Sequence, residues 1–409
     1  MTTTEAAERL GVKPETLYAY VSRGLIEPRR VPGGVSTFAA RDVERLARSG
    51  RRSRALPPLV FPSALTRIAD GRVTYRGLDA VEAASTHTFE QVAEWLWIGD
   101  WQERPSWPVD LVALDRAVAA QQPMPTESLP IDRFRVIAAV VGAEHGTGRQ
   151  ADVLTDARRL IRLMAHGLPR ADRRAARRAE PARSVAEVLW TRLTRLPRNP
   201  HRVAVLDLAL GLLADHELAS STLAARLAAM VRARVPDVVG AGLNVLAGVR
   251  HGGASVPIEA LLRDAVRVGA EDALTDRLGP PRDNGSAAAP RRVARSGEAA
   301  GIEGFGHELY PRGDPRAVAL IDRLEDLDAP GDRLAVVRGV LAVAAHRGLP
   351  PPTVDLALAA VAFCADMPPG SGEAVFALAR AAGWIAHAIE QYGQPTFMRA
   401  RVDYIGPDG

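Results

Sequence analysis

The chain has 409 residues, of which 47% are hydrophobic and 24% charged, so it can bury a large core and by its length should form two or three domains. This composition excludes a disordered chain, and no apolar stretch approaches the roughly 18 to 20 residues of a membrane span. The start of the chain lacks the features of a signal peptide, so we expect a cytoplasmic protein. Cys364 is the only cysteine, which excludes an intrachain disulfide and a cysteine metal cluster.

Positive charge is concentrated near the N-terminus. Residues 1–54 contain eleven Lys or Arg and six Asp or Glu, a surplus of +5, whereas the whole chain carries +4. Lys13 is the only lysine, and an arginine-rich and alanine-rich composition can reflect a GC-rich genome alone. The distribution is therefore more informative than the total. A basic terminal segment on a nearly neutral chain indicates a nucleic-acid-binding domain.

The first 54 residues predict short helices and a hairpin. In chain order these are a helix over residues 4–10, a helix over 15–23, a hairpin over 25–38 that turns at Gly33 and Gly34, and a helix over 42–48. Gly11 ends the first helix, and Pro14 suits the first position of the second. The unit resembles the winged helix-turn-helix heads of the mercury-resistance-regulator and excisionase families.

This resemblance implies a DNA contact through the second helix. The candidate side chains near the major groove are Lys13, Thr16, Tyr18, Tyr20 and Arg23, with Arg29 and Arg30 contacting phosphates. The alternative is a retained fold that serves dimer contacts only.

The rest of the chain reads as mainly α-helical. Residues 49–58 suit a linker, and residues 169–183 and 279–301 suit surface loops or weak helices. Helical spacing is clear over residues 89–98, 134–144, 185–196, 203–213, 221–231, 334–346, 354–363 and 373–389. Strand-like alternation is scarce, and Cys364 lies in an apolar run that predicts core packing.

Three histidines stand out because glycines or charges flank them. These are His216 in Asp-His-Glu, His251 in Arg-His-Gly-Gly, and His307 in Gly-Phe-Gly-His. Asp355 is a lone carboxylate on an apolar stretch, so it either faces solvent or lies in a cleft with a raised pKa, as a general base does. Taken singly, each residue is more often a loop or core residue than a functional one.

In this order and spacing, the motifs resemble the citrate synthase family over about 330 residues. The matching segments are residues 73–77, 89–101, 214–222, 242–255, 304–316, 352–355, 379–391 and 399–406. The combination of Gly-Phe-Gly-His, Asp-Pro-Arg and His-Gly-Gly-Ala is the most specific part. A bacterial branch of this family carries a helix-turn-helix head, and the whole chain is similar to it.

The resemblance implies a mechanism and a set of site residues. Asp355 matches the base that removes a proton from the acyl-CoA thioester, His251 the residue that binds the enolate oxygen, and His307 the residue that polarises and protonates the oxaloacetate carbonyl. The residues that match the contacts to oxaloacetate are His216, Arg316, Arg380 and Arg399. The family contributes the arginine that matches Arg399 across a dimer interface, so a homodimer is implied.

The resemblance also implies the arrangement of domains and the place of the acyl-CoA site. The predicted domains are a winged helix-turn-helix domain over 1–54, a large domain over 55–255 and 351–409, and a small domain over 256–350 that closes over oxaloacetate. The small domain would bind acyl-CoA near Gly304 and Gly306, with Arg312 and Arg250 as candidates for the phosphates. No metal and no cofactor beyond the CoA substrate are expected, nor is a membrane partner.

Some residues depart from the family pattern. Thr353 stands where asparagine is common, Arg250 where an apolar residue is usual, and Ala400 where a proline lies between two arginines. These departures leave open an inactive relative, a condensation of other substrates, or a DNA-binding regulator that senses a metabolite. The sequence does not separate acetyl-CoA from propionyl-CoA, which differ by one methylene.

Overall fold

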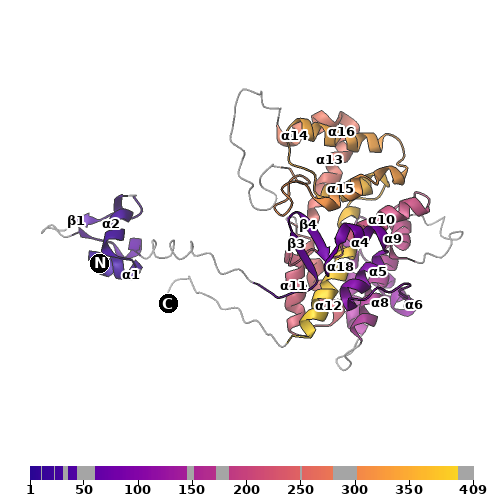
Figure 1. The fold of residues 1–409 in the computed structure, drawn as a ribbon, viewed down its shortest axis with the longest axis horizontal. Coiled ribbons are helices and arrows are strands. Elements are labelled where there is room, and N and C mark those ends of the chain that lie inside the picture. The colour runs from indigo at the N-terminus through magenta and orange to yellow at the C-terminus, as the bar shows by residue number, and fades with distance from the viewer. Residues whose placement is uncertain are drawn as a thin grey trace. The chain divides into compact units, whose positions relative to one another are not determined.

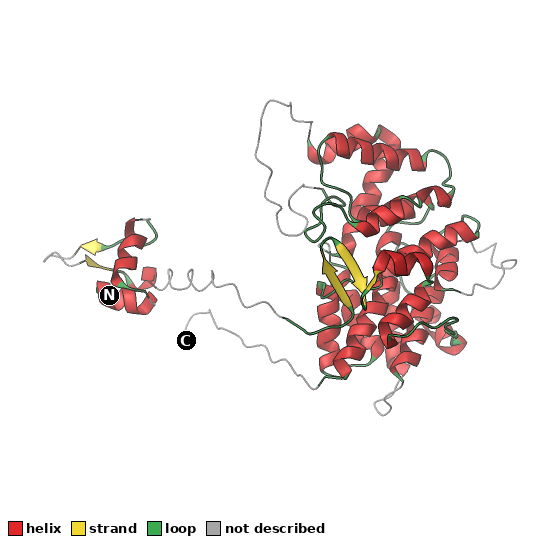
Figure 2. Ribbon diagram, in the orientation of Figure 1, coloured by secondary structure: helices red, strands yellow, loops and turns green. Residues whose placement is uncertain are grey.

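The computed structural model describes residues 1–10, 12–22, 24–30, 36–43, 60–144, 152–171, 184–248, 251–279 and 302–394. The chain divides into two compact units, residues 1–62 and 63–409 (Figure 1). Helices dominate both units, as predicted (Figure 2). Within the described residues, none of the helices has the length and apolar character needed to cross a membrane.

The N-terminal unit contains the predicted helix-turn-helix. Helices α1 (Thr3–Leu10) and α2 (Pro14–Ser22) precede an antiparallel pair of short strands, β1 (Arg29–Arg30) and β2 (Ser36–Thr37). Its small core consists of Ala6, Ala7, Leu17, Ile26, Phe38 and Val43. Residues 40–43 begin the predicted third helix, but most of that helix, the turn at Gly33 and Gly34 and the predicted linker lie outside the described residues.

The second unit begins with a hairpin that the sequence analysis did not predict. Strand β3 (Thr66–Ala69) pairs antiparallel with β4 (Arg72–Tyr75), and the short β5 (Leu78–Asp79) pairs with β4. Along β4 Val73 and Tyr75 are buried while Arg72 is exposed, so the alternation exists but spans only four residues. A signal this short is easily missed in a helical chain.

Helices form the rest of this unit (Figure 1). In chain order they are α4 (Ala80–Thr86), α5 (Phe89–Ile98), α6 (Leu111–Ala120), α7 (Pro130–Glu144), α8 (Val153–Gly167), α9 (Val185–Leu193), α10 (Pro200–Leu213), α11 (Ser220–Met230), α12 (Val235–Leu246), α13 (Ser255–Val268), α14 (Ala270–Leu278), α15 (Pro315–Ile321), α16 (Arg333–His346), α17 (Val354–Cys364) and α18 (Ser371–Tyr392). Two 3-10 turns lie at Gly252–Ala254 and Leu324–Leu327.

Most predicted helices are present, with shifts at their ends. Helix α9 ends at Leu193 rather than at residue 196, because Thr194 is extended and its hydroxyl donates to the Ala365 carbonyl at 2.5 Å. Helices α4, α6, α8, α12, α13, α14 and α15 were not among the predicted segments. The predicted loop over 169–183 is described only at its first residues, and that over 279–301 only at Gly279.

Helix α18 is the centre of the large core. It packs against α5, α7, α8, α10, α11, α12, α13 and α17, and nearly all of its residues are buried. A helix that is apolar on every side has to lie inside a protein. Cys364, at the end of α17, is buried as predicted.

Close packing between α12 and α18 yields a stability prediction. A Cβ on Gly242 would lie 2.5 Å from the Trp384 ring, whereas a Cβ on Gly240, in the same helix, would meet nothing within 4 Å. We expect Gly242→Ala to lower the free energy of unfolding by about 2 to 3 kcal/mol through overpacking. Gly240→Ala should raise it by about 0.5 to 1 kcal/mol, since alanine favours the helix. Urea unfolding of the two variants checks this, and equal effects would contradict the packing argument.

Candidate active site

His216 lies in a tight turn between α10 and α11. Its neighbour Glu217 has φ of +50°, an uncommon conformation for a residue with a side chain. The Glu217 carboxylate accepts a 2.6 Å hydrogen bond from the Ile68 amide, and the Asp215 carboxylate accepts one of 2.5 Å from the Thr66 hydroxyl. Strand β3 therefore holds this turn on both sides of the histidine.

His307 lies in a loop that is bonded to the segment before α17. The Gly306 amide donates to the Pro351 carbonyl and the Thr353 amide to the Gly304 carbonyl, both at 2.9 Å. Gly304 has φ of +92°, and a Cβ there would come within 2.9 Å of Ile258. This φ and the close approach of Ile258 both require glycine at position 304. The backbone pairing brings the His307 loop beside the start of α17, where Asp355 lies.

Two of the predicted histidines meet at Tyr310. The rings of His216 and His307 are 5.7 Å apart, and Tyr310 lies 4.8 Å from His307. The His216 Nε2 atom is 2.7 Å from the Tyr310 hydroxyl. The sequence analysis did not single out Tyr310, although an aromatic residue three positions after His307 in a loop rich in glycine and proline was a usable signal.

Two buried arginines adjoin this group, and their surroundings differ. Arg316 is 2% exposed and forms a bidentate ion pair with Asp314, at 3.0 and 2.8 Å. Arg380 is 1% exposed, donates from Nε to the Leu213 carbonyl at 2.9 Å, and its Nη2 atom has no hydrogen-bond partner among the described residues. Burial lowers the pKa of Arg380 to about 10, which still leaves it protonated at neutral pH.

An unpaired cation in a protein interior is costly unless a ligand neutralises it. Arg380 lies close enough to Arg316 and His216 for their charges to interact. The arrangement is therefore suited to an anion, and guanidinium groups are suited to carboxylates.

Both loop histidines are held in the neutral form. Burial, with Arg316 nearby, lowers the pKa of His216 far below its ordinary value and also lowers that of His307. The Leu309 amide donates to His307 Nδ1 at 3.1 Å, so that nitrogen carries the lone pair and the hydrogen is on Nε2. His307 thus offers a neutral N–H donor.

His251 lies at the 3-10 turn before α13, and α11 and α18 hold it. The Ser221 hydroxyl is 2.8 Å from its Nε2 atom, and the Trp384 indole donates to the same hydroxyl at 3.3 Å. Burial, with Arg380 nearby, lowers the pKa of His251 to about 4. The Phe376 ring centre lies 6.0 Å from that of His251, and the Arg380 guanidinium carbon lies 4.7 Å from the same Phe376 ring centre.

Asp355 occupies the first turn of α17. The Thr353 hydroxyl lies 3.4 Å from its Oδ2 atom. Burial raises the pKa of the Asp355 carboxyl, and Arg316 opposes part of that rise. A carboxylate in this environment is a stronger base than one in water. The residue that departs from the family pattern, Thr353, is therefore the hydrogen-bonding neighbour of the candidate base.

A basic groove adjoins the Tyr310 loop. One cavity of about 720 Å³ lies over β3 and β4 and reaches Arg312, and a second of about 520 Å³ shares Asp70, Arg72 and Arg312 with it. Arg67, Arg72 and Arg312 are all exposed. The groove can attract a polyanion such as a nucleotide phosphate.

Some predicted residues are not part of this arrangement as described. Arg399, Arg250 and Arg23 lie outside the described residues, so their positions stay predictions. In the N-terminal unit Lys13 is exposed and Thr16 is half-buried. Tyr20 packs against the core of that unit, whereas Tyr18 is 57% exposed. Arg29 and Arg30 form β1.

The described part of the chain contains no group of three or more His, Cys, Asp or Glu residues that could hold a metal ion.

The chain belongs to the citrate synthase family, because the profile "Citrate synthase, C-terminal domain" matches residues 58–401. A second profile, "Helix-turn-helix domain", matches residues 1–51. Citrate synthase 2 of Bacillus subtilis is 27% identical over 85% of this chain and 93% of its own length. The 2-methylcitrate synthase of Mycobacterium tuberculosis is 26% identical over 82% of this chain and 84% of its own length.

The fold also agrees with a solved structure. Citrate synthase from Thermoplasma acidophilum, in a ternary complex with carboxymethyl coenzyme A and oxaloacetate, superposes with a TM-score of 0.64 at 19% identity, over 86% of this chain and 95% of that one. At this identity the likeness concerns the fold alone.

The contrast between the two arginines can be measured without a substrate. Arg380→Met removes a buried unpaired charge, so we expect the free energy of unfolding to rise by about 1 to 3 kcal/mol, reduced in part by the lost bond to Leu213. Arg316→Met leaves Asp314 buried without its partner and should lower the same quantity by about 3 to 5 kcal/mol. Urea unfolding at neutral pH distinguishes them, and a strong loss of stability in both would show that Arg380 is paired in solution.

Proposed function

We propose that this protein condenses oxaloacetate with an acyl-CoA, acetyl-CoA or propionyl-CoA, to give citrate or 2-methylcitrate and free CoA. The observation that carries the proposal is Arg380, a buried cation without an acidic partner, beside two neutral histidines. The similar proteins support this reaction class, since they include a protein named citrate synthase and one named 2-methylcitrate synthase.

Oxaloacetate supplies the missing negative charges. One carboxylate pairs with Arg380, and the other approaches Arg316, whose Nη1 remains after Asp314 has taken Nε and Nη2. His216 adds a hydrogen bond, and Arg399 is the expected third arginine. The ketone oxygen then faces His307 Nε2–H, which polarises the carbonyl.

The bond-forming step needs a carbanion from the acyl-CoA. Asp355 takes a proton from the carbon next to the thioester, and His251 donates a hydrogen bond to the enolate oxygen that forms. The carbanion attacks the keto carbon of oxaloacetate, the C–C bond forms, and the ketone oxygen takes a proton from His307. Water then cleaves the thioester to a carboxylate and the CoA thiol.

The basic groove suits the CoA part of the substrate. Arg312 lines it beside the loop that carries Gly304 and Gly306, and Arg250 is the expected further cation. Phosphates in the groove would place the thioester end toward His251 and Asp355. We also propose that the predicted small domain, residues 256–350, closes over oxaloacetate to exclude water.

We propose a homodimer for the enzyme body. Leu227 on α11, Val231 directly after it and Val245 on α12 are exposed to 40%, 63% and 37%. The two helices pack against each other. A second copy would cover this apolar surface and supply Arg399.

The head supports a second activity, binding of duplex DNA in the cytoplasm. The match to the helix-turn-helix profile favours DNA binding. So do two exposed side chains, Lys13 directly before α2 and Tyr18 on it. In that case the condensing body would also act as a sensor of oxaloacetate or acyl-CoA, and two heads of a dimer would read a two-fold site.

The base is tested by Asp355→Asn. This variant should reduce CoA release at least about a thousandfold while the affinity for oxaloacetate changes less than about threefold, because the carboxylate contacts lie elsewhere. CoA release is measured with a thiol reagent, using acetyl-CoA and propionyl-CoA, and products are identified by mass. Asp366→Asn, beyond the C-terminal end of the same helix, is the matched control and should retain full activity. Substantial turnover by Asp355→Asn would remove Asp355 from its role.

DNA binding is tested by selecting duplexes on the full chain. We expect one sequence to be bound at physiological salt, and Lys13→Ala to weaken binding and reduce the salt slope by about one. Glu127→Ala, a charge change in the enzyme body, is the control. Binding that is equal for all duplexes and lost at moderate salt would contradict a reading head.

A further inference from the structure

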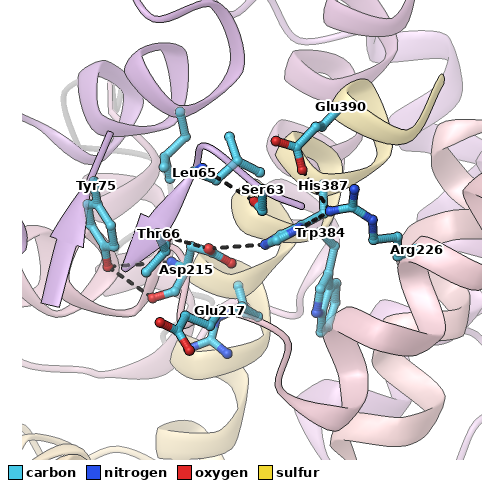
Figure 3. Close-up of polar contacts among 12 residues, drawn as sticks. Ser63, Leu65, Thr66, Tyr75, Asp215, Glu217, Arg226, Trp384, His387 and Glu390 are labelled. Atoms are coloured by element: carbon cyan, nitrogen blue, oxygen red, sulfur yellow. Dashed lines mark hydrogen bonds and ion pairs between the residues drawn. The ribbon is translucent and has the colours of Figure 1, made fainter. Parts of the chain in front are cut away.

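A buried chain of hydrogen bonds ends beside His216, and the proposed mechanism assigns it no role. Asp215, which precedes His216, is fully buried. Its Oδ2 atom accepts from the Thr66 hydroxyl at 2.5 Å and contacts His387 Nε2 at 3.2 Å (Figure 3). These residues come from β3, from the turn after α10 and from α18.

The far end of the chain fixes the proton on His387. Arg226 Nη1 lies 3.1 Å from His387 Nδ1, and a guanidinium can only donate. His387 Nδ1 therefore accepts, its hydrogen is on Nε2, and that N–H donates to Asp215. Arg226 itself forms an ion pair with Glu390 at 2.7 Å (Figure 3). It also donates to Gln391 at 2.9 Å.

Asp215 is ionised at the end of this chain. Burial alone opposes its charge, but His387, Arg380 and the Thr66 hydroxyl together hold the pKa of its carboxyl below the ordinary value. Two donors on one oxygen also orient the carboxylate. On its other side, Oδ1 lies against α18, since a Cβ on Gly383 would come within 2.4 Å of it. Oδ1 itself has no hydrogen-bond partner among the described residues, so the two bonds to Oδ2 are the ones that orient the carboxylate.

The backbone of the turn is held by the same elements. The Tyr75 hydroxyl, on β4, lies 2.9 Å from the Leu212 carbonyl and 3.2 Å from the Asp215 carbonyl. Glu217 maintains its unusual φ while bonded to β3. Such a conformation is retained only where its surroundings enforce it.

We infer that Thr66, Asp215 and His387 are positioning residues that fix the His216 ring for the dicarboxylate. The inference rests on the proposed function for the identity of that ligand, oxaloacetate. None of the three touches the reacting atoms. They act by holding the turn, so that His216 meets the substrate without reorganising.

Thr66→Val tests this, because it removes the hydroxyl at nearly constant volume. We expect the KM for oxaloacetate to rise about tenfold, the loss typical of one charge-assisted hydrogen bond, while the KM for acyl-CoA is unchanged. Thr191→Val, on α9 and away from the basic groove, removes a hydroxyl that bonds only within its own helix; it is the control and should leave both constants as they are. Unchanged oxaloacetate kinetics in Thr66→Val would overturn the inference.

A double-mutant cycle separates positioning from general loss of structure. If Thr66 acts through His216, Thr66→Val should not weaken oxaloacetate binding further in a His216→Ala background. Equal weakening in both backgrounds would overturn the inference. At α18, His387→Leu should reproduce the effect of Thr66→Val, and His387→Gln, which keeps a donor for Asp215, should restore much of the affinity. These variants keep the test open if Thr66→Val does not fold.

A readout without substrate distinguishes this inference from the proposed function. In ¹⁵N-histidine spectra, Thr66→Val should shift or broaden the ring signals of His216 and leave those of His201, an exposed histidine, unchanged. A wild-type protein that neither binds nor turns over oxaloacetate would refute the proposed function, while the His216 signals would still report on positioning. His216 signals identical to wild type would overturn the inference.

Discussion

A buried guanidinium whose Nη2 atom has no hydrogen-bond partner among the described residues, that of Arg380, is the constraint on which the rest of the site depends. The ionised Asp215 lies near enough to interact with its charge. Arg380 lies on α18, most of whose residues are buried, and donates to the carbonyl of Leu213 at the end of α10. Burial is the main reason why the pKa values of His216 and His251 are lowered, and Arg380 adds to it, since protonating either histidine would add charge beside an existing cation. The two guanidinium groups also favour an anion over a neutral ligand at this group of residues.

Arg316 and Arg380 differ in their partners within the protein. Arg316 is held by Asp314, which also accepts from the Val354 amide at 3.2 Å, so that the guanidinium and the start of α17 share one carboxylate. Arg380 is free of such a partner among the described residues. Arg316 is thus preorganised by the protein, and under the proposed function Arg380 is the one that pairs with the ligand. Stability is given up at Arg380, as is common at binding sites.

Much of this could be predicted from the sequence, but only through motif order. Helical spacing indicated most helices, and the glycine-flanked histidines and Asp355 indicated the site. Each of these residues alone was weak evidence. The parts that were missed depend on contacts between distant segments: the four-residue strands of the hairpin, the Tyr310 contact with His216, and the Thr66 contact with Asp215. A threonine hydroxyl on a short strand carries no sequence signal of its own, because its role depends on Asp215, which comes close to it only in the folded chain.

The hydrogen bonds around the 215–217 turn have a consequence for synthesis on the ribosome. Ala64 donates to Glu390 across 326 positions, and Asp215 receives one partner from β3 and another from α18. The head, with its own core, can fold as soon as it emerges. The site around the 215–217 turn cannot, because β3 and α18, the segments that hold it, lie near the two ends of the second unit. A chain whose synthesis stops before α18 would therefore have a folded head but an incomplete site. Only a chain synthesised through α18 could bind the proposed ligand, oxaloacetate.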